Sequence, residues 1–369
     1  MSNTTYKELI GALAMKGGAV PALECPELYA LLEELFTPEE AKLACQMPVD
    51  AISAVDLVSS TGRSLEEVER LLDAMCNKGL AICRERGGVD VCSLHQLMPG
   101  IFEYQFMKGE VNERNKKLAR LFEDYLNLVF DLTEKAAKKG VTVKAFPFAR
   151  VIAVEEEITA GTAIQPYDRV SSYIENAQYI AVSQCYCRHH GELLGKPCDK
   201  PKEVCLTFGP GAKFNAERGF GRPISKEEAR RILDLAEKEG LVHCSSNMGK
   251  HVDFICNCCV CHCPILQTIK SAAMPNAGAT SAYIAMVAEE DCSGCGDCVE
   301  RCPMEALVMD GDVVRQDAGR CIGCGLCVST CPTGALSMAP RLDRPHTPWD
   351  RKELYAAMTA SLKIDQLSS

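Results

Sequence analysis

Apolar residues three and four positions apart predict a largely helical N-terminal domain. Two short helices are expected at 27–36 and 38–46. A third is expected after Ser64, a residue type that commonly caps a helix N-terminus, and Glu67 would complete a capping box. Gly79 would end this helix. Its apolar face consists of Leu65, Val68, Leu71, Leu72 and Met75.

A β-hairpin is predicted directly after this helix, with strands at 81–86 and 89–93 joined by Gly87 and Gly88. Helix, turn, helix and hairpin together resemble the winged helix-turn-helix of bacterial regulators. The helix after Ser64 is the one that would enter the DNA groove. It carries more acidic than basic side chains, and so it would repel phosphates. The pattern therefore disfavours nucleic acid and favours protein docking. The charged residues are Glu66, Glu67, Glu69 and Asp73 against Arg70 and Lys78.

A long amphipathic helix is predicted next, within the connecting segment 109–145. Its apolar positions repeat at alternating intervals of four and three, inside a charged stretch that ends at Lys139 and Gly140. Such a stripe can face the core or form a dimer, and both interpretations stay open here. The stripe consists of Leu118, Phe122, Tyr125, Val129, Leu132 and Ala136.

The 23 cysteines fall into three groups. Five lie in the first 92 residues, ten lie between 185 and 263, and eight lie between 292 and 331. The N-terminus lacks a secretory pattern, so metal binding or thiol chemistry is expected rather than disulfides. Four of the N-terminal group lack ligand spacing and are expected to be small buried apolar residues. These are Cys45, Cys76, Cys83 and Cys92.

Two C-terminal segments repeat the spacing C-x2-C-x2-C-x3-C-P, which is the signature of dicluster ferredoxins. The last cysteine of each repeat ligates the other cluster in such proteins. The spacing therefore predicts two [4Fe-4S] clusters. Cluster I would take Cys292, Cys295, Cys298 and Cys331, and cluster II would take Cys302, Cys321, Cys324 and Cys327.

The remaining C-terminal pattern fits a small ferredoxin fold at 286–340. A hairpin is expected over 306–314, with its turn at Asp310 and Gly311. Glycines 294, 296, 323 and 325 would permit the backbone twists around the clusters. The tail, 341–369, is polar, with an amphipathic helix at about 350–362 that docks on the body or on a partner.

The middle segment, 146–285, is predicted to be a cysteine-rich α+β domain. An apolar strand from Tyr179 runs into Cys185 and Cys187, which would share one face because strand residues alternate. A helix capped by Ser225 is expected to end before Gly240. Ten thiols in this segment exceed what a core needs, and they predict one or two further iron–sulfur clusters. A structural zinc site and a redox-active dithiol are the alternatives. Five histidines stay unassigned as ligands, namely His189, His190, His243, His251 and His262.

Several middle-domain motifs, among them Gln-Cys-Tyr-Cys-Arg-His-His from 184 and Cys-Asn-Cys-Cys from 256, resemble a group of 4Fe-4S dicluster proteins of anaerobes. The resemblance covers roughly 150–340 and implies iron–sulfur binding. The chain departs from the group's pattern at 260–263, which leaves the roles of Cys261 and His262 open. The cysteines that the resemblance implies as further ligands are Cys185, Cys187, Cys198, Cys205, Cys256, Cys258, Cys259 and Cys263.

The net charge is −10, which disfavours wholesale nucleic-acid binding and suits docking on basic patches of redox partners. No apolar run is long enough to span a bilayer, so a cytoplasmic protein is expected. No dinucleotide-binding turn or P-loop occurs in the context that those sites need. The partners expected are therefore a ferredoxin, a flavoprotein or an oxidoreductase subunit, and a homodimer or a larger complex is compatible with the pattern.

Taken together, the sequence predicts an α+β chain with a winged-helix-like domain at 1–108, the connecting helix, the middle domain, the ferredoxin domain and the tail. The favoured function is electron relay in anaerobic metabolism, as a non-catalytic subunit of an oxidoreductase complex. Two alternatives are a redox-sensing winged-helix regulator and a catalytic subunit that uses a site-differentiated cluster in the middle domain.

Overall fold

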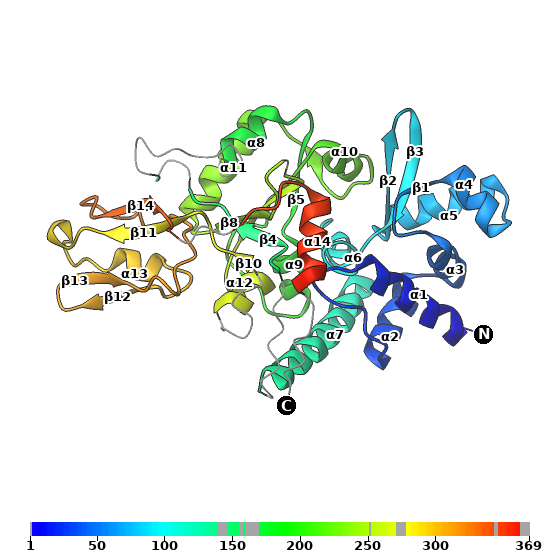
Figure 1. Cartoon of the computed structure of the whole chain (residues 1–369), viewed down its shortest axis with the longest axis horizontal. Coiled ribbons are helices and arrows are strands. Elements are labelled where there is room, and N and C mark those ends of the chain that lie inside the picture. The colour runs from blue at the N-terminus through cyan, green and yellow to red at the C-terminus, as the bar shows by residue number, and fades with distance from the viewer. Residues whose placement is uncertain are drawn as a thin grey trace. The chain divides into compact units, whose positions relative to one another are not determined.

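The chain forms two compact units in a computed structural model (Figure 1). The structure describes residues 2–138, 146–154, 158, 170–250, 252–270, 278–342 and 346–361. Unit 1 comprises Met1–Thr133, Ser183–Pro197 and Ala212–Arg222, and unit 2 comprises Glu134–Val182, Cys198–Gly211 and Pro223–Ser369. Helices and strands are mixed in both units, so the predicted α+β class is confirmed at this level.

Unit 1 is built from helices around one apolar core, with a small three-stranded sheet of order β1-β3-β2. Its elements are α1 (Ser2–Lys16), α2 (Pro26–Leu35), α3 (Pro38–Gln46), β1 (Ile52–Ser53), α4 (Ala54–Thr61), α5 (Leu65–Asn77), β2 (Ala81–Arg86), β3 (Val89–Leu94), α6 (Ile101–Phe106), most of α7 (Glu113–Lys138), α9 (Tyr186–Leu193) and most of α10 (Gly209–Glu217).

Only one of the two hydrogen bonds predicted at the N-terminus of α5 is present. The Ser64 side chain accepts a hydrogen bond from the Glu67 amide, as expected. The Glu67 carboxylate pairs with the Arg63 guanidinium, and no return bond to the Ser64 amide closes a capping box. That part of the prediction is wrong, because Arg63 offers the carboxylate a charged partner one turn away. A complete capping box occurs at α3, between Thr37 and Glu40.

The predicted hairpin is confirmed, since β2 and β3 pair antiparallel from Ala81 opposite Leu94 to Arg86 opposite Val89. Cys83 lies directly opposite Cys92 in this ladder, and the two form a disulfide. The expectation that Cys83 and Cys92 serve only as small buried apolar residues is therefore wrong. The physical reason is the register, which brings the two Cα atoms to 4.0 Å.

The long helix α7 faces the core over its first half. Leu118, Phe122 and Tyr125 are buried in the apolar core of unit 1, whereas Leu132 is 46% exposed. The Tyr125 hydroxyl also accepts a hydrogen bond from the Leu23 amide. The core-facing interpretation thus holds for the N-terminal turns. Among the described helices, none combines the length and the apolar composition that crossing a bilayer requires.

Unit 2 is organised by a seven-stranded sheet of order β10-β4-β8-β9-β6-β5-β7. Neighbouring strands β4, β8, β9 and β6 are antiparallel, and β10 is parallel to β4. The elements of this part are β4 (Ala149–Val151), α8 (Val170–Asn176), β5 (Ile180–Gln184), β6 (Glu203–Phe208), β7 (Arg222–Pro223), α11 (Lys226–Lys238), β8 (Val242–Ser246), β9 (Phe254–Cys258), α12 (Pro264–Lys270) and β10 (Gly278–Ala279).

The two faces of this sheet differ in chemistry. Leu206 and Ile255 are paired across β6 and β9, and both pack in a core with residues of α8 and α11 such as Ile174 and Leu233. Strand residues alternate between faces, so the neighbours of these apolar residues point the opposite way. Two of those four neighbours are cysteines, Cys205 and Cys256. The helix α11 begins at its predicted cap, where the Ser225 side chain accepts from the Glu228 amide.

The ferredoxin-like module of unit 2 consists of two small antiparallel sheets, β11–β14 and β12–β13. The predicted hairpin is confirmed, with Asp310 opposite Val313 and Gly311 at φ 64°. Glycines 294, 296, 323 and 325 all have φ between 69° and 85°, as expected for the twisted loops. The elements are β11 (Tyr283–Val287), the 3₁₀ turn η3 (Glu289–Asp291), α13 (Asp297–Arg301), β12 (Leu307–Asp310), β13 (Val313–Gln316) and β14 (Leu336–Pro340).

The tail docks on the body of unit 2. The predicted helix is present as α14 (Arg351–Ser361), and the Arg351 guanidinium pairs with Asp253 at 2.7 Å. Just before α14, the Lys250 amide donates to the Trp349 carbonyl at 2.7 Å. The tail is thus held by both an ion pair and backbone hydrogen bonds.

Replacing Gly323 with alanine should destabilise the ferredoxin-like module more than replacing Gly334. Both residues have positive φ, 69° and 73°, so each substitution carries a left-handed strain of about 1–2 kcal/mol. A Cβ on Gly323 would in addition lie 1.9 Å from the Tyr283 carbonyl oxygen, whereas a Cβ on Gly334 meets no atom within 4 Å. Thermal unfolding followed by circular dichroism measures the difference. Equal losses in the two variants would show that the close packing around Gly323 is wrong.

Candidate functional site

Eight cysteines of the ferredoxin-like module line two separate cavities. The first cysteine pocket, with an empty volume of about 330 Å³, is lined by Cys292, Cys295, Cys298 and Cys331. The second cysteine pocket, of about 370 Å³, is lined by Cys302, Cys321, Cys324 and Cys327. The structure thus gathers the cysteines in the two crossed groups that the repeat spacing predicts. Their roles as ligands remain a prediction.

The helix α13 links the two pockets. It is five residues long, carries Cys298 of the first pocket, and is capped at its C-terminus by Cys302 of the second. In the other repeat, Cys327 lies in the second pocket and Cys331 in the first. Each repeat therefore contributes its fourth cysteine to the pocket of the other. This exchange requires both repeats to be folded before either pocket is complete.

The surroundings of the thiols suit a buried iron–sulfur cluster. Apolar side chains complete both linings, including Val314 and Leu336 in the first pocket and Ile322 and Leu307 in the second. The Ala306 amide donates to the Cys302 sulfur at 3.3 Å, the kind of hydrogen bond that tunes cluster potentials. Four soft sulfur donors in a largely apolar cavity fit a [4Fe-4S] cluster.

The pKa values of the pocket thiols shift in opposite directions from the usual value of a cysteine. Burial raises the pKa of Cys324 to about 12, and it also raises that of Cys327. At Cys331 burial acts in the same sense, but hydrogen bonds from the Thr333 hydroxyl and from nearby amides outweigh it and lower the pKa. Thiolates in the second pocket consequently need a cationic partner to form near neutral pH.

Part of the middle domain packs directly against the second pocket. The Val154 amide donates to the Cys324 carbonyl at 3.0 Å, and a Cβ on Gly325 would lie 3.2 Å from the Val154 side chain. The Arg301 guanidinium of α13 donates to the Lys238 carbonyl at 3.0 Å and to the Glu237 carbonyl. These are C-terminal carbonyls of α11, where a cation is favoured by the helix dipole. The module is therefore anchored to the sheet domain by backbone and charged contacts.

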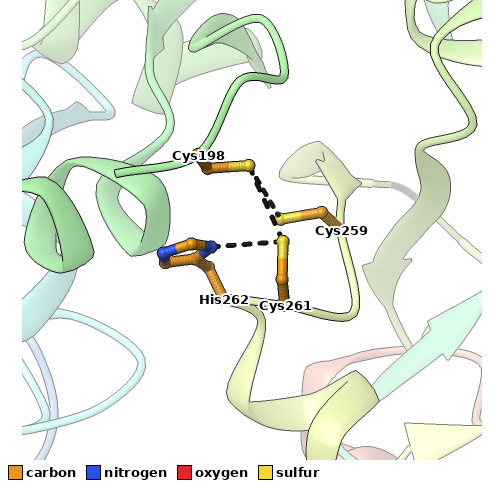
Figure 2. A group of neighbouring side chains, drawn as sticks. All are labelled: Cys198, Cys259, Cys261 and His262. Atoms are coloured by element: carbon orange, nitrogen blue, oxygen red, sulfur yellow. Dashed lines mark hydrogen bonds between the residues drawn. The ribbon is translucent and has the colours of Figure 1, made fainter. Parts of the chain in front are cut away.

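A second kind of cysteine site lies in the middle domain (Figure 2). Three cysteines and a histidine converge so that one ligand atom of each lies within 4.8 Å of the others. The group consists of Cys198, Cys259, Cys261 and His262, and we call it the Cys–His quartet. Burial, followed by the thiols of Cys259 and Cys198, raises the pKa of Cys261 to about 12, although the residue reaches the surface.

A third group of thiols lies on the face of the sheet opposite α11. Cys244 of β8 is directly opposite Cys256 of β9, and Cys258 lies two residues further along the same face. The Cys258 thiol hydrogen-bonds with those of Cys244, Cys256 and Cys263, and these contacts raise its pKa well above the usual value. We call these four residues the thiol face. Its members come from the β8–β9 pair and from the turn that follows.

The eight middle-domain cysteines predicted as ligands do not form one set. Cys198 and Cys259 belong to the Cys–His quartet, and Cys256, Cys258 and Cys263 to the thiol face. The β6–β9 register, in which Leu206 pairs with Ile255, places the preceding Cys205 beside Cys256. Cys185 and Cys187 belong to unit 1, whereas the other six cysteines of the set belong to unit 2.

The prediction that Cys185 and Cys187 share a strand face is wrong. The strand β5 ends at Gln184, Cys185 is the N-terminal cap of α9, and Cys187 lies inside that helix. Residues two apart in a helix do not face the same way. The strand stops at Gln184, and the polar residues Arg188, His189 and His190 are buried in the helix that follows.

Most of the unassigned histidines have structural partners. His190 contacts the Ala119 carbonyl at 3.0 Å, and His189 lies between Glu192 and the Glu110 carbonyl. His243 contacts Asn257 at 2.6 Å and Glu237 at 3.0 Å. His251 lies outside the described residues. His262 alone of the five joins a ligand-like group among the described residues.

Sequence reasoning missed Cys244 and left Cys261 and His262 open. In β8, alternation places Cys244 on the opposite face from His243 and Ser245. This alternation indicates a thiol site only when the partner strand, which brings Cys256 opposite Cys244, is known. For Cys261 and His262, the departure from the related pattern at 260–263 was itself the signal. The group could not be completed from the local sequence, because its fourth member, Cys198, is 63 residues from Cys261.

Comparison with known proteins identifies one part of the chain. Residues 276–338 match a family model described as a 4Fe-4S dicluster domain. No curated protein and no solved structure matches the chain. The matched segment contains all eight cysteines of the two pockets. The C-terminal part of this protein is thus a ferredoxin-type iron–sulfur domain.

Proposed function

We propose that this protein is an iron–sulfur electron carrier that relays low-potential electrons between a ferredoxin or flavoprotein and a partner oxidoreductase in anaerobic metabolism. The observation that carries the proposal is the pair of crossed four-cysteine pockets within a 4Fe-4S dicluster domain. A [4Fe-4S] cluster bound by four thiolates supplies one-electron chemistry at low potential. We assign the first pocket's cysteines to cluster I and the second pocket's to cluster II.

The chain's own residues adapt the two pockets to this task in different ways. Cys295 of the first pocket is exposed, whereas Cys321 and Cys327 of the second are buried. The second pocket is also the one in contact with Val154 of the sheet domain. Electrons would therefore exchange with a soluble partner at the first pocket and pass toward the middle domain from the second.

The surface around the first pocket is acidic. Residues 286–340 contain nine acidic and three basic side chains, a net charge of −6. Glu290, Asp291 and Asp297 are exposed in the segment that carries Cys292 and Cys295. Such a surface attracts basic patches on partner proteins, and it acts mainly on the association rate. The preferred partner is a redox protein with a basic docking surface.

We further propose that the N-terminal part is a winged helix used for docking rather than for DNA. The order α3, β1, α4, α5, β2, β3 supports the topology. The charges of α5 are engaged within unit 1, since Asp73 pairs with Arg218 and Lys78 pairs with Glu40 at 2.7 Å. With four carboxylates against Arg70 and a Lys78 that is already paired, this helix offers little to phosphates.

The middle domain is proposed to hold one further [4Fe-4S] cluster on the thiol face. The observations that support it are the opposition of Cys244 and Cys256 and the contacts of Cys258 with three neighbouring thiols. The soft donor set is the one that iron–sulfur clusters use. This narrows the expectation of one or two clusters to one, and replaces the predicted eight-cysteine set by Cys244, Cys256, Cys258 and Cys263.

Anaerobically purified protein should contain about twelve iron and about twelve acid-labile sulfide per chain, because each of three clusters holds about four. Colorimetric iron and sulfide assays with redox-titrated EPR measure this. About eight of each would contradict the cluster on the thiol face and leave the two ferredoxin clusters standing. Fewer than eight after reconstitution would contradict the two-pocket assignment itself.

The crossed assignment predicts which cysteine variants behave alike. Cys292→Ser and Cys331→Ser should alter the same EPR signal, because both residues line the first pocket. Cys302→Ser and Cys321→Ser should alter the other signal. Cys25→Ser, outside both pockets, is the control. If Cys331→Ser altered the same signal as Cys321→Ser instead, each cluster would be bound within its own repeat and the crossover would be wrong.

Neither the oxidised nor the reduced protein should bind duplex DNA at 150 mM salt. The acidic α5 and the net charge of −10 both oppose phosphate contacts. A gel-shift assay on mixed genomic fragments, run anaerobically in both redox states, tests this. Tight binding that weakens steeply with salt and depends on redox state would favour a redox-sensing regulator over an electron carrier.

A further inference from the structure

We propose that the Cys–His quartet binds a single tetrahedral zinc ion, separately from the iron–sulfur clusters. The distances between ligand atoms carry this proposal. The Cys198 sulfur lies 3.6 Å from that of Cys261 and 4.0 Å from that of Cys259. The Cys261 sulfur lies 3.2 Å from Nδ1 of His262. Four sulfur ligands at about 2.3 Å from one zinc ion are about 3.8 Å apart, which is the separation seen here.

The quartet also differs from a cubane site in its donors, since one of its four ligands is an imidazole nitrogen. In a [4Fe-4S] cluster each thiolate binds a different iron at a corner of the cube, so the four sulfurs surround a body of eight atoms. The ferredoxin pockets of this chain have such a donor set, since four cysteines and no histidine line each of them. Across the part of the chain that the structure describes, the quartet is the one group whose ligand atoms all lie within 4.8 Å of one another.

The donor set selects the metal. Three sulfurs and one imidazole nitrogen, with no position left open, is a combination that structural zinc sites use. For the same donors zinc also binds more tightly than ferrous iron. With three thiolates and a neutral imidazole the site would carry a net charge of −1, which the exposed position of Cys261 leaves in contact with solvent.

The backbone already holds three of the ligands in place. Cys259, Cys261 and His262 lie in the turn between β9 and α12, where the Cys263 amide donates to the Cys259 carbonyl at 3.0 Å. The Gln267 side chain, one turn into α12, donates to the Cys261 carbonyl at 2.8 Å. Only the loop that carries Cys198 has to be brought to this turn. Figure 2 shows that loop reaching the turn from a separate segment of the chain.

The zinc ion would therefore fasten the loop before β6 to the end of β9. Cys259 is buried and Cys198 half-buried, and both pack against the apolar core between the sheet and α11. The two segments are 61 residues apart along the chain. A metal bond across such a separation converts binding free energy into folding free energy. The role assigned to the ion is structural, because no coordination position is free for a substrate.

Zinc analysis and zinc K-edge X-ray absorption on the full-length, anaerobically purified protein test the proposal. We expect about one zinc per chain, with three sulfurs at about 2.3 Å and one nitrogen at about 2.0–2.1 Å. This zinc should persist when the protein is reconstituted with iron and sulfide. Zinc that is lost while iron rises by about four per chain would overturn the proposal in favour of a cluster at the quartet. Absence of zinc from protein grown with zinc supplied would also overturn it.

A conservative exchange identifies the histidine as a ligand. In His262→Cys, the zinc content should stay at about one per chain while the first shell changes from three sulfurs and one nitrogen to four sulfurs. Cys198→Ser should lose the zinc and leave the two ferredoxin EPR signals in place. Cys25→Ser is the matched control and should keep both zinc and signals. An unchanged nitrogen shell in His262→Cys would show that His262 is not a ligand, and the proposed site would be wrong.

Discussion

The structure of the electron-carrying module depends on one geometric constraint, the exchange of a cysteine between its two repeats. Each pocket takes three thiols from one loop and the fourth from the other, so neither pocket exists in an isolated repeat. The short helix α13 enforces the exchange by presenting Cys298 to one pocket and ending at Cys302, which lines the other. Two clusters bound in these pockets would share one folded framework, which would keep them at a fixed separation.

The backbone around the pockets is shaped by the same requirement. Positive φ at Gly294, Gly296, Gly323 and Gly325 lets each loop wrap a cavity within a few residues. At Gly323 the Tyr283 carbonyl approaches so closely that any side chain would collide with it. On the other side, Arg301 binds the carbonyl end of α11 and Val154 binds the Cys324 carbonyl. The module is thus joined to the sheet domain through the second pocket, which gives the proposed electron path its direction.

In the middle domain, one set of strands supports both an apolar core and groups of cysteines. The β6–β9–β8 ladder buries an apolar face against α11 and turns cysteines toward the opposite face. The turn after β9 then adds the Cys–His quartet, whose ligand atoms all lie within 4.8 Å of one another. The quartet, with three sulfurs and one imidazole nitrogen, and the thiol face, with four sulfurs, therefore differ in their donor sets. Spacing in space is a property that neighbouring strands and loops determine together.

The sequence by itself determined the elements whose signals are local. The doubled cysteine spacing, the Asp310–Gly311 turn, the Ser225 cap and the apolar stripe of α7 each depend on residues a few positions apart, and all are found in the structure. Tertiary structure alone decided the partners. The register brings Cys83 to Cys92 and Cys244 to Cys256, and the loop with Cys198 reaches a turn 61 residues away. The positions of Cys185 and Cys187 were also decided there, because the first caps α9 and the second lies inside that helix. All cysteine side chains are chemically the same, so only the fold determines whether each one binds a metal, forms a disulfide or packs in the core.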